Sequence, residues 1–215
     1  MRFARGARRW TAVAALLVVP AVVLLGATGL AALALPVLVA LFFRDPERTP
    51  EGDGVLAPAD GRITVLGRDD DRDGRVRLGI FMNLTDVHVN RAPVAGHVAS
   101  REHRSGGHRP AFTKDSERNE RVVWRFAALG GDGADGVAGS DDDSFEVVQI
   151  AGTVARRITP YVEEGATVDR GGRIGVIAFG SRVDVVFPPG YGVEDLVVER
   201  GDRVRAGETV VAPEP

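Results

Sequence analysis

The chain contains no cysteine and a single lysine among its 215 residues. Without cysteine there can be no disulfide, no thiolate nucleophile and no cysteine-ligated metal. The lysine, Lys114, lies in a charged polar stretch, which disfavours cofactors such as pyridoxal phosphate that require an enzyme lysine. The formal net charge of −3 supplies no basic surface for nucleic acid.

Charged residues are absent from one long segment, residues 10–43. As a straight helix this segment would measure about 51 Å at about 1.5 Å per residue, whereas the hydrocarbon layer of a membrane is about 30 Å thick. Pro20, the Gly26/Gly29 pair and Pro36 offer places for a kink or a turn. The segment is therefore either a kinked span or a hairpin that enters and leaves the membrane on one side.

A secretory signal is the alternative interpretation of this N-terminus, since "MRFARGARR" is basic. The apolar stretch is too long for a signal peptide, and "RDPERTP" follows it in place of a small-residue cleavage site. We therefore expect residues 1–43 to form a basic N-terminus and a retained membrane anchor. The basic end should remain on the cytoplasmic side.

Residues 44–215 read as a mainly β domain. Short β-type runs are separated by glycine turns, and these runs are "GVLAPADGRITVLG", "RVRLGIFM", "ERVVWRFAAL" and "FEVVQIAG". Between them we expect a hairpin tip at 69–74, a long polar loop at 100–121 and a flexible Gly/Asp-rich stretch at 130–144. Residues 163–179 and 198–214 repeat a Gly-x-x-Val-x-x-Gly pattern. We expect a compact hairpin sandwich or barrel that resembles lipoyl and biotinyl carrier domains. Neither repeat has the lysine that a carrier needs.

Three short stretches combine reactive side chains with apolar flanks. Asp60 follows Pro-Ala in a turn-like "PADG", which is also ordinary turn chemistry. Asp86, His88 and Asn90 would share one face of a strand, and the alternative is a solvated surface strand. The third stretch is "IAFGSRVDVVFP", where Gly180-Ser181 separates two β-type runs and could also be a bulge.

A serine hydrolase would need Ser181 on a strand-to-helix elbow with a G-x-S-x-G pattern, and neither is present. A serine between two strands has another use. Its hydroxyl can attack the carbonyl of Gly180 to form an ester, and β-elimination then cuts the chain and leaves a pyruvoyl group. A histidine oriented by an aspartate would supply the base.

Together, six stretches resemble the short, prokaryotic form of phosphatidylserine decarboxylase, including archaeal members that are associated with archaetidylserine: "APADGRI", "DVHVNRAP", "DSERNER", "QIAG", "ARRI" and "RIGVIAFGSRVDV". The resemblance covers residues 44–215. It implies a pyruvoyl-dependent carboxy-lyase that converts phosphatidylserine or archaetidylserine to the ethanolamine lipid and CO₂ through a Schiff base. It also implies self-cleavage into a β chain, 1–180, and an α chain, 181–215, which remain together as a heterodimer.

Carried over by position, the resemblance implies that Ser181 is the precursor of the pyruvoyl cofactor, Asp60 the residue that orients the base, and His88 the base. Longer relatives have a second histidine where this chain has Arg91. Either His88 serves both self-cleavage and decarboxylation, or another residue assists, with His103 and His108 as candidates. Their spacing with His97 does not suggest a metal site.

Arg91, Arg118 and Arg121 are candidates for binding the phosphate or carboxylate of the lipid head group, although any of them could simply be an exposed arginine. The anchor would hold the protein at the cell membrane, with its catalytic domain on the cytoplasmic side. The sequence does not decide whether the protein also forms a higher homo-oligomer.

Two rival functions remain at this point. A non-catalytic module that binds lipid surfaces would keep an uncut chain with a free seryl hydroxyl. A serine hydrolase acting on lipids would keep an intact chain that a serine-directed probe labels at Ser181.

Overall fold

The structure is a computed structural model that describes residues 2–107, 119–128, 144–152, 158–178 and 181–214. The chain divides into two compact units, residues 1–47 and 48–215. The predicted flexible stretch 130–144 lies almost wholly outside the described residues, as do His108, Lys114, Arg118 and Gly180.

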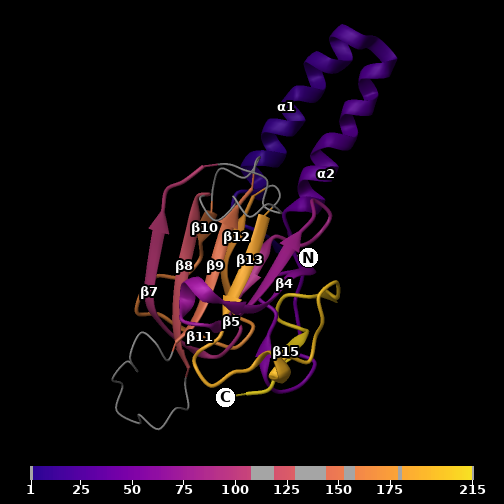
Figure 1. Cartoon of the computed structure of the whole chain (residues 1–215). Helices are drawn as coiled ribbons and strands as arrows, with labels where there is room; N and C mark the ends of the chain where they lie inside the picture. Colours follow the sequence, from indigo (N-terminus) through magenta and orange to yellow (C-terminus); the bar gives the residue numbers. More distant parts are fainter. Residues whose placement is uncertain (1, 108–118, 129–143, 153–157, 179–180, 215) are drawn as a thin grey trace. The chain divides into compact units, whose positions relative to one another are not determined.

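The first unit is a helical hairpin. Its elements are β1 (Arg2–Phe3), α1 (Ala7–Leu25), the 3-10 helix η1 (Gly26–Leu33), α2 (Ala34–Phe42) and β2 (Arg44–Asp45). The antiparallel pairing of β1 with β2 brings both ends of the segment together, so the hairpin form is the one adopted (Figure 1). At the turn, Gly29 lies so close to the carbonyl of Ala21 that no side chain would fit there.

Large apolar side chains on this hairpin face outward, among them Leu16, Val23 and Leu24. Residues 7–42 are long and apolar enough to cross a membrane by length and composition. The α1 arm of 19 residues measures about 28 Å at 1.5 Å per residue, close to the thickness of the hydrocarbon layer. The unit is therefore compatible with membrane association.

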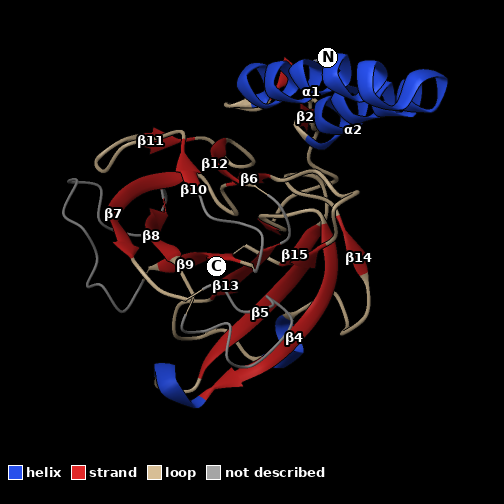
Figure 2. Cartoon of the chain, turned by 90° about the horizontal axis from the view of Figure 1, so that it is seen from above, coloured by secondary structure: helices blue, strands red, loops and turns tan. Residues whose placement is uncertain are grey.

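The second unit is mainly β, as predicted, and is built on a curled antiparallel sheet. Within the described residues the strands of this sheet lie in the order β11 (Thr167–Val168), β7 (Gly96–Arg104), β8 (Arg121–Ala128), β9 (Phe145–Ala151), β13 (Ser181–Val186), β5 (Arg75–Met82), β4 (Gly61–Asp69) and β14 (Arg203–Val204). Figure 2 shows the curl, which gives the sheet the form of a half-barrel.

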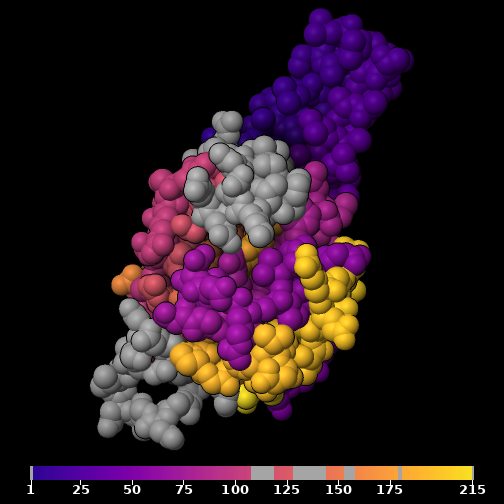
Figure 3. Space-filling model, viewed as in Figure 1, coloured from indigo at the N-terminus to yellow at the C-terminus, as the bar shows by residue number. Residues whose placement is uncertain are grey.

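The described residues of the second unit also form two smaller sheets. One has the strand order β10 (Ile158–Pro160), β12 (Arg173–Ile177) and β6 (Val89–Arg91), and the other pairs β15 (Val210–Ala212) with β3 (Val55–Leu56). Among the residues that the structure describes, the short 3-10 helices η2 (Asp70–Arg72) and η5 (Val193–Asp195) lie in connections between strands. In the C-terminal segment, β14 pairs with β4. The space-filling view shows this segment, in yellow, beside the purple and magenta part of the second unit (Figure 3).

The predicted β-type runs correspond to β3 to β5, β8 and β9, and the hairpin tip at 69–74 is confirmed. Asp73 and Gly74 have positive φ there, and the carboxylate of Asp69 accepts a hydrogen bond from the amide of Asp71. The prediction of a loop over 100–121 is wrong at its start, because β7 runs to Arg104. Charged residues continue that strand because one of its faces is exposed to solvent.

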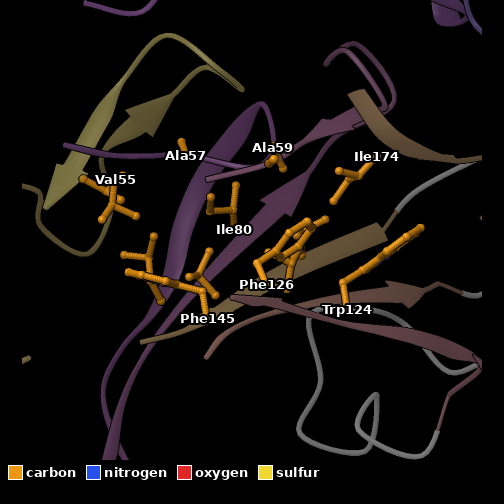
Figure 4. Packing of buried hydrophobic residues seen from close by; sticks show 14 of the residues in the cluster. Val55, Ala57, Ala59, Ile80, Trp124, Phe126, Phe145 and Ile174 are labelled. Carbon is orange, nitrogen blue, oxygen red and sulfur yellow. The ribbon is translucent and has the colours of Figure 1, made fainter. Parts of the chain in front are cut away.

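The core lies inside the curl (Figure 4). Trp124, Phe126, Phe145 and Phe187 are its largest buried side chains. Each fully buried side chain of this kind stabilises the fold by about 1.5–3 kcal/mol.

The internal repeat in the sequence forms a matched pair of turns. Gly171 and Gly207 both have left-handed φ angles and occupy equivalent positions of the two repeats. Their backbones pack against each other, and a side chain at Gly207 would come within 2.6 Å of Cδ of Arg91. Glycine is therefore required at this contact.

Candidate functional site

Ser181 is the first residue of β13, a central strand of the curled sheet. It pairs with Met82 of β5 on one side and with Ala151 of β9 on the other. The preceding strand, β12, belongs to the three-stranded sheet. Ser181 thus begins a strand that belongs to a different sheet from β12, the strand before it in the sequence.

The hydroxyl of Ser181 is buried and has no hydrogen-bond partner among the described residues. Along β13 the side chain of Ser181 shares its face with Val183 and Val185, which are part of the core. A buried hydroxyl without a partner costs about 1–3 kcal/mol. Such a cost at one serine in an apolar interior is typical of a reactive group.

His88 is fully buried next to β6. Its Nδ1 lies 3.0 Å from the carbonyl oxygen of Asp86, which can only accept, so Nδ1 carries the proton and Nε2 is the basic nitrogen of the neutral ring. The amide of Ile177 donates to the His88 carbonyl at 3.3 Å. Because Ile177 precedes Ser181 by four residues, which span at most about 14 Å, this bond sets an upper limit on the distance between the His88 backbone and Ser181.

The stretch around His88 is not a solvated surface strand. The strand β6 comprises only Val89–Arg91, and Asp86 lies in a turn where its carboxylate accepts from the amide of Asn83 at 2.7 Å. Asp86, His88 and Asn90 are all buried. The turn therefore holds the Asp86 carbonyl in place for His88.

Asp60 lies at the start of β4 in a buried cluster of charges. Its carboxylate accepts from Arg48 at 2.7 Å and from the amide of Ala206 at 2.8 Å. Desolvation raises the pKa of Asp60, an effect that Arg48 partly offsets and that Asp86 reinforces. The hydrogen bonds of Asp60 are thus with Arg48 and Ala206, and its role in orienting His88 stays a prediction.

The three predicted arginines have different surroundings. Arg91 is buried and donates to the carbonyl of Gly171 at 2.9 Å. Arg121 is paired in register with Ile150, which pairs with Arg182, so Arg121 lies on the sheet face opposite to Ser181. Arg118 lies outside the described residues. Head-group binding by these arginines stays a prediction.

The opposite face of β13 carries an ionic network. Asp184 accepts from Arg77 at 2.6 Å and from Arg182 at 2.6 Å, and all three side chains are largely buried. A hollow of about 390 Å³ on this face is lined by charged residues that include Glu146 and Arg121. Glu146 pairs with Arg72 and Arg75 in this hollow, which lies on the sheet face opposite to Ser181.

His97 and His103, the other two histidines among the described residues, have hydrogen-bond partners of their own. His103 is half-exposed on β7 and bonds Glu120 at 3.1 Å, while His97 bonds Thr167 at 3.0 Å. Within the described ranges no group of three His, Asp or Glu side chains could hold a metal.

The sequence-based search missed one polar cluster in the core. Trp124 donates to Gln149 and Gln149 donates to Asn90, each at 2.7 Å, and all three are fully buried. The signal available in the sequence was a glutamine in the middle of the apolar run "FEVVQIAG". A buried amide of that kind must have internal partners.

Comparison with known proteins identifies the family. Residues 35–212 match the family model for phosphatidylserine decarboxylase. The chain belongs to this family of carboxy-lyases. No solved structure matches.

Several curated proteins are similar over most of the chain. A protein of Halobacterium salinarum named "Putative archaetidylserine decarboxylase proenzyme" is 52% identical over 86% of this chain and 85% of its own. Phosphatidylserine decarboxylase proenzymes of Thermobifida fusca and Streptomyces avermitilis are 50% and 46% identical, over 83% and 97% of this chain and 76% and 92% of theirs.

Proposed function

We propose that this chain is a self-cleaving proenzyme whose product decarboxylates phosphatidylserine or archaetidylserine to the ethanolamine lipid. The observation that carries the proposal is the buried hydroxyl of Ser181, which has no hydrogen-bond partner among the described residues and lies at the start of β13. The names of the similar proteins support the substrate class and the proenzyme state. The ester and ether forms of the lipid differ in their tails, so both remain within the proposal.

Self-cleavage uses the chain's own residues. His88 Nε2 takes the proton of the Ser181 hydroxyl as the oxygen adds to the carbonyl carbon of residue 180. The C–N bond then breaks, the amine takes the proton, and an ester remains. Loss of the Ser181 Cα proton and cleavage of the Cβ–O bond release a carboxylate and leave dehydroalanine. This tautomerises to an imine, which water hydrolyses to a ketone and ammonia.

The residues around Ser181 fit the resulting pyruvoyl group. The serine that would form it is enclosed by the core, where the reactive carbonyl is protected from water. Such a group supplies a carbonyl that condenses with the substrate amine and accepts the electron pair left by CO₂. The single lysine is consistent with a chemistry that does not use an enzyme lysine.

The two chains would stay together after cleavage. β13 lies between β9 and β5, so the first strand of the α chain is hydrogen-bonded on both sides by the β chain. Further pairings join β14 to β4 and β15 to β3. The buried ion pair of Arg48 with Glu208 also connects the two chains.

The hairpin form of the N-terminal unit supports a cytoplasmic catalytic domain at the cell membrane. Both of its ends lie together, and Arg2, Arg5, Arg8 and Arg9 are at one of them. By the positive-inside tendency that end is cytoplasmic, and the chain leaves the hairpin on the same side.

The test compares the wild type with Ser181→Ala, and Ser100→Ala is the matched control. The proposal predicts a cut wild type and control that release CO₂ from phosphatidylserine vesicles, and an uncut, inactive Ser181→Ala. Normal cutting of Ser181→Ala would reject the site. An uncut wild type that a serine-directed acylating probe labels at Ser181 would favour a hydrolase, and an uncut, unlabelled one a binding module.

A further inference from the structure

A chain of hydrogen bonds between amides runs through the core beside Ser181. It begins at the indole of Trp124 on β8, passes through Gln149 on β9 and ends at Asn90 on β6. Each link is 2.7 Å long, and the three side chains are fully buried. Burying three polar groups in an apolar core is costly unless all are hydrogen-bonded, so the end of this chain at Asn90 decides whether the cost is fully offset.

The indole determines the direction of every bond in the chain. Trp124 Nε1–H can only donate, so the oxygen of the Gln149 amide must face it. The nitrogen of Gln149 then donates to Oδ1 of Asn90. As a result the Nδ2 amide group of Asn90 has to point the other way.

The Asn90 amide group points to a weak acceptor. Its Nδ2 lies 3.6 Å from the Sδ of Met82, and a thioether sulfur accepts hydrogen bonds poorly. Met82 is the cross-strand partner of Ser181. The Asn90 amide group, whose orientation is fixed, and the Ser181 hydroxyl, which has no partner among the described residues, are therefore both next to Met82.

We propose that Asn90 supplies the hydrogen-bond donor that stabilises the oxyanion of self-cleavage, and that Gln149 and Trp124 are positioning residues that fix its orientation. When Ser181 Oγ adds to the preceding carbonyl carbon, the π electron pair moves onto the carbonyl oxygen, and Asn90 Nδ2–H donates to that charge. The proton of the hydroxyl goes to His88. This inference rests on the proposed self-cleavage.

Two substitutions at Asn90 test the donor. Loss of one oxyanion donor slows a reaction by about 10²–10³-fold, so Asn90→Ala and the near-isosteric Asn90→Asp should both lengthen the half-time of cutting by that factor. Cutting is followed by gel and mass spectrometry, and the melting temperature is measured on the same samples. A wild-type rate in a folded Asn90→Asp variant would overturn the inference, whereas an uncut wild type would overturn the proposed function instead.

The positioning role is tested by Trp124→Phe, with Phe126→Leu as the matched control. Both shorten a buried aromatic side chain of the same core, and the two rings stack at 6.4 Å, but only Trp124 donates to Gln149. Losing one hydrogen bond of about 1 kcal/mol corresponds to about fivefold. We expect Trp124→Phe to cut about fivefold more slowly and Phe126→Leu to cut at the wild-type rate. Equal slowing of both would attribute the effect to packing and reject the role.

Discussion

Polar side chains on the two faces of β13 differ in how fully they are hydrogen-bonded. On the inner face, the Ser181 hydroxyl is buried without a partner among the described residues. On the outer face, three residues further along the strand, Asp184 receives hydrogen bonds from both Arg77 and Arg182. The same strand thus carries one unsatisfied group and one saturated network.

The difference suggests that the outer face stabilises the strand and that the inner face carries the chemistry. The outer network, the two neighbouring strands and the buried ion pairs hold β13 in place, so the inner face can keep a group that destabilises the fold. Removing the inner group should abolish chemistry at little cost in stability, and removing the outer one should do the reverse.

The largest effect on the inner face beyond Ser181 itself is expected at His88. Removing a general base costs about 10²–10⁴-fold in rate, so His88→Gln should slow self-cleavage by that factor while the protein remains folded. Quenched time points on a gel measure the half-time. Fast cutting in this variant would assign the base to another residue.

A substitution on the outer face should lower the free energy of unfolding. Asp184→Ala leaves Arg77 and Arg182 buried without their shared partner, which costs about 3–5 kcal/mol. Urea unfolding should register this loss, while the folded fraction should still cut. Asp71→Asn, at the exposed hairpin tip, is the control and should change stability by less than about 0.5 kcal/mol. A stable Asp184→Ala variant that fails to cut would contradict the division between the two faces.

The stability of the protein as a function of pH should depend on Asp60. Burial raises its pKa in the folded state above the ordinary value of 3.8. The folded protein therefore binds this proton more tightly than the unfolded chain, and the associated stability is present at low pH and lost as pH rises through the raised pKa. Relative to Asp60→Asn, the wild type should become more stable as pH falls from 7 towards 4. A difference that does not vary with pH would contradict the shift.

The smallest effect is expected at Arg203. This side chain is mostly exposed and bonds Asp86 at 3.0 Å. An exposed ion pair contributes about 0.2–1 kcal/mol, so Arg203→Gln should lower the free energy of unfolding by no more than that. Urea titration checks the value. A loss of several kcal/mol would show that the pair helps to hold the turn before His88.

Much of the β unit could be predicted from the sequence, because its strands are apolar runs bounded by glycine turns. The hairpin tip at 69–74 and the equivalent glycines of the repeat could be predicted for that reason. The order of the strands in the sheet could not be predicted. Nothing local indicates that β12 and β13, only a few residues apart, belong to different sheets.

The site was predictable in its parts and not in its contacts. Ser181 and His88 stood out by chemistry, and both are buried. The Arg48 partner of Asp60 follows the anchor, and the Ala206 partner is in the last ten residues. Such long-range pairs depend on the tertiary fold. The Gln149 link was signalled only by an amide within an apolar run.

Intact-mass spectrometry of the purified wild-type chain distinguishes a self-cleaved protein from an intact one. We expect two polypeptides, with the smaller one spanning 181–215, blocked to Edman degradation and lighter than its encoded peptide by the mass of ammonia. A single uncut chain that still releases CO₂ from a phosphoserine lipid would contradict this expectation.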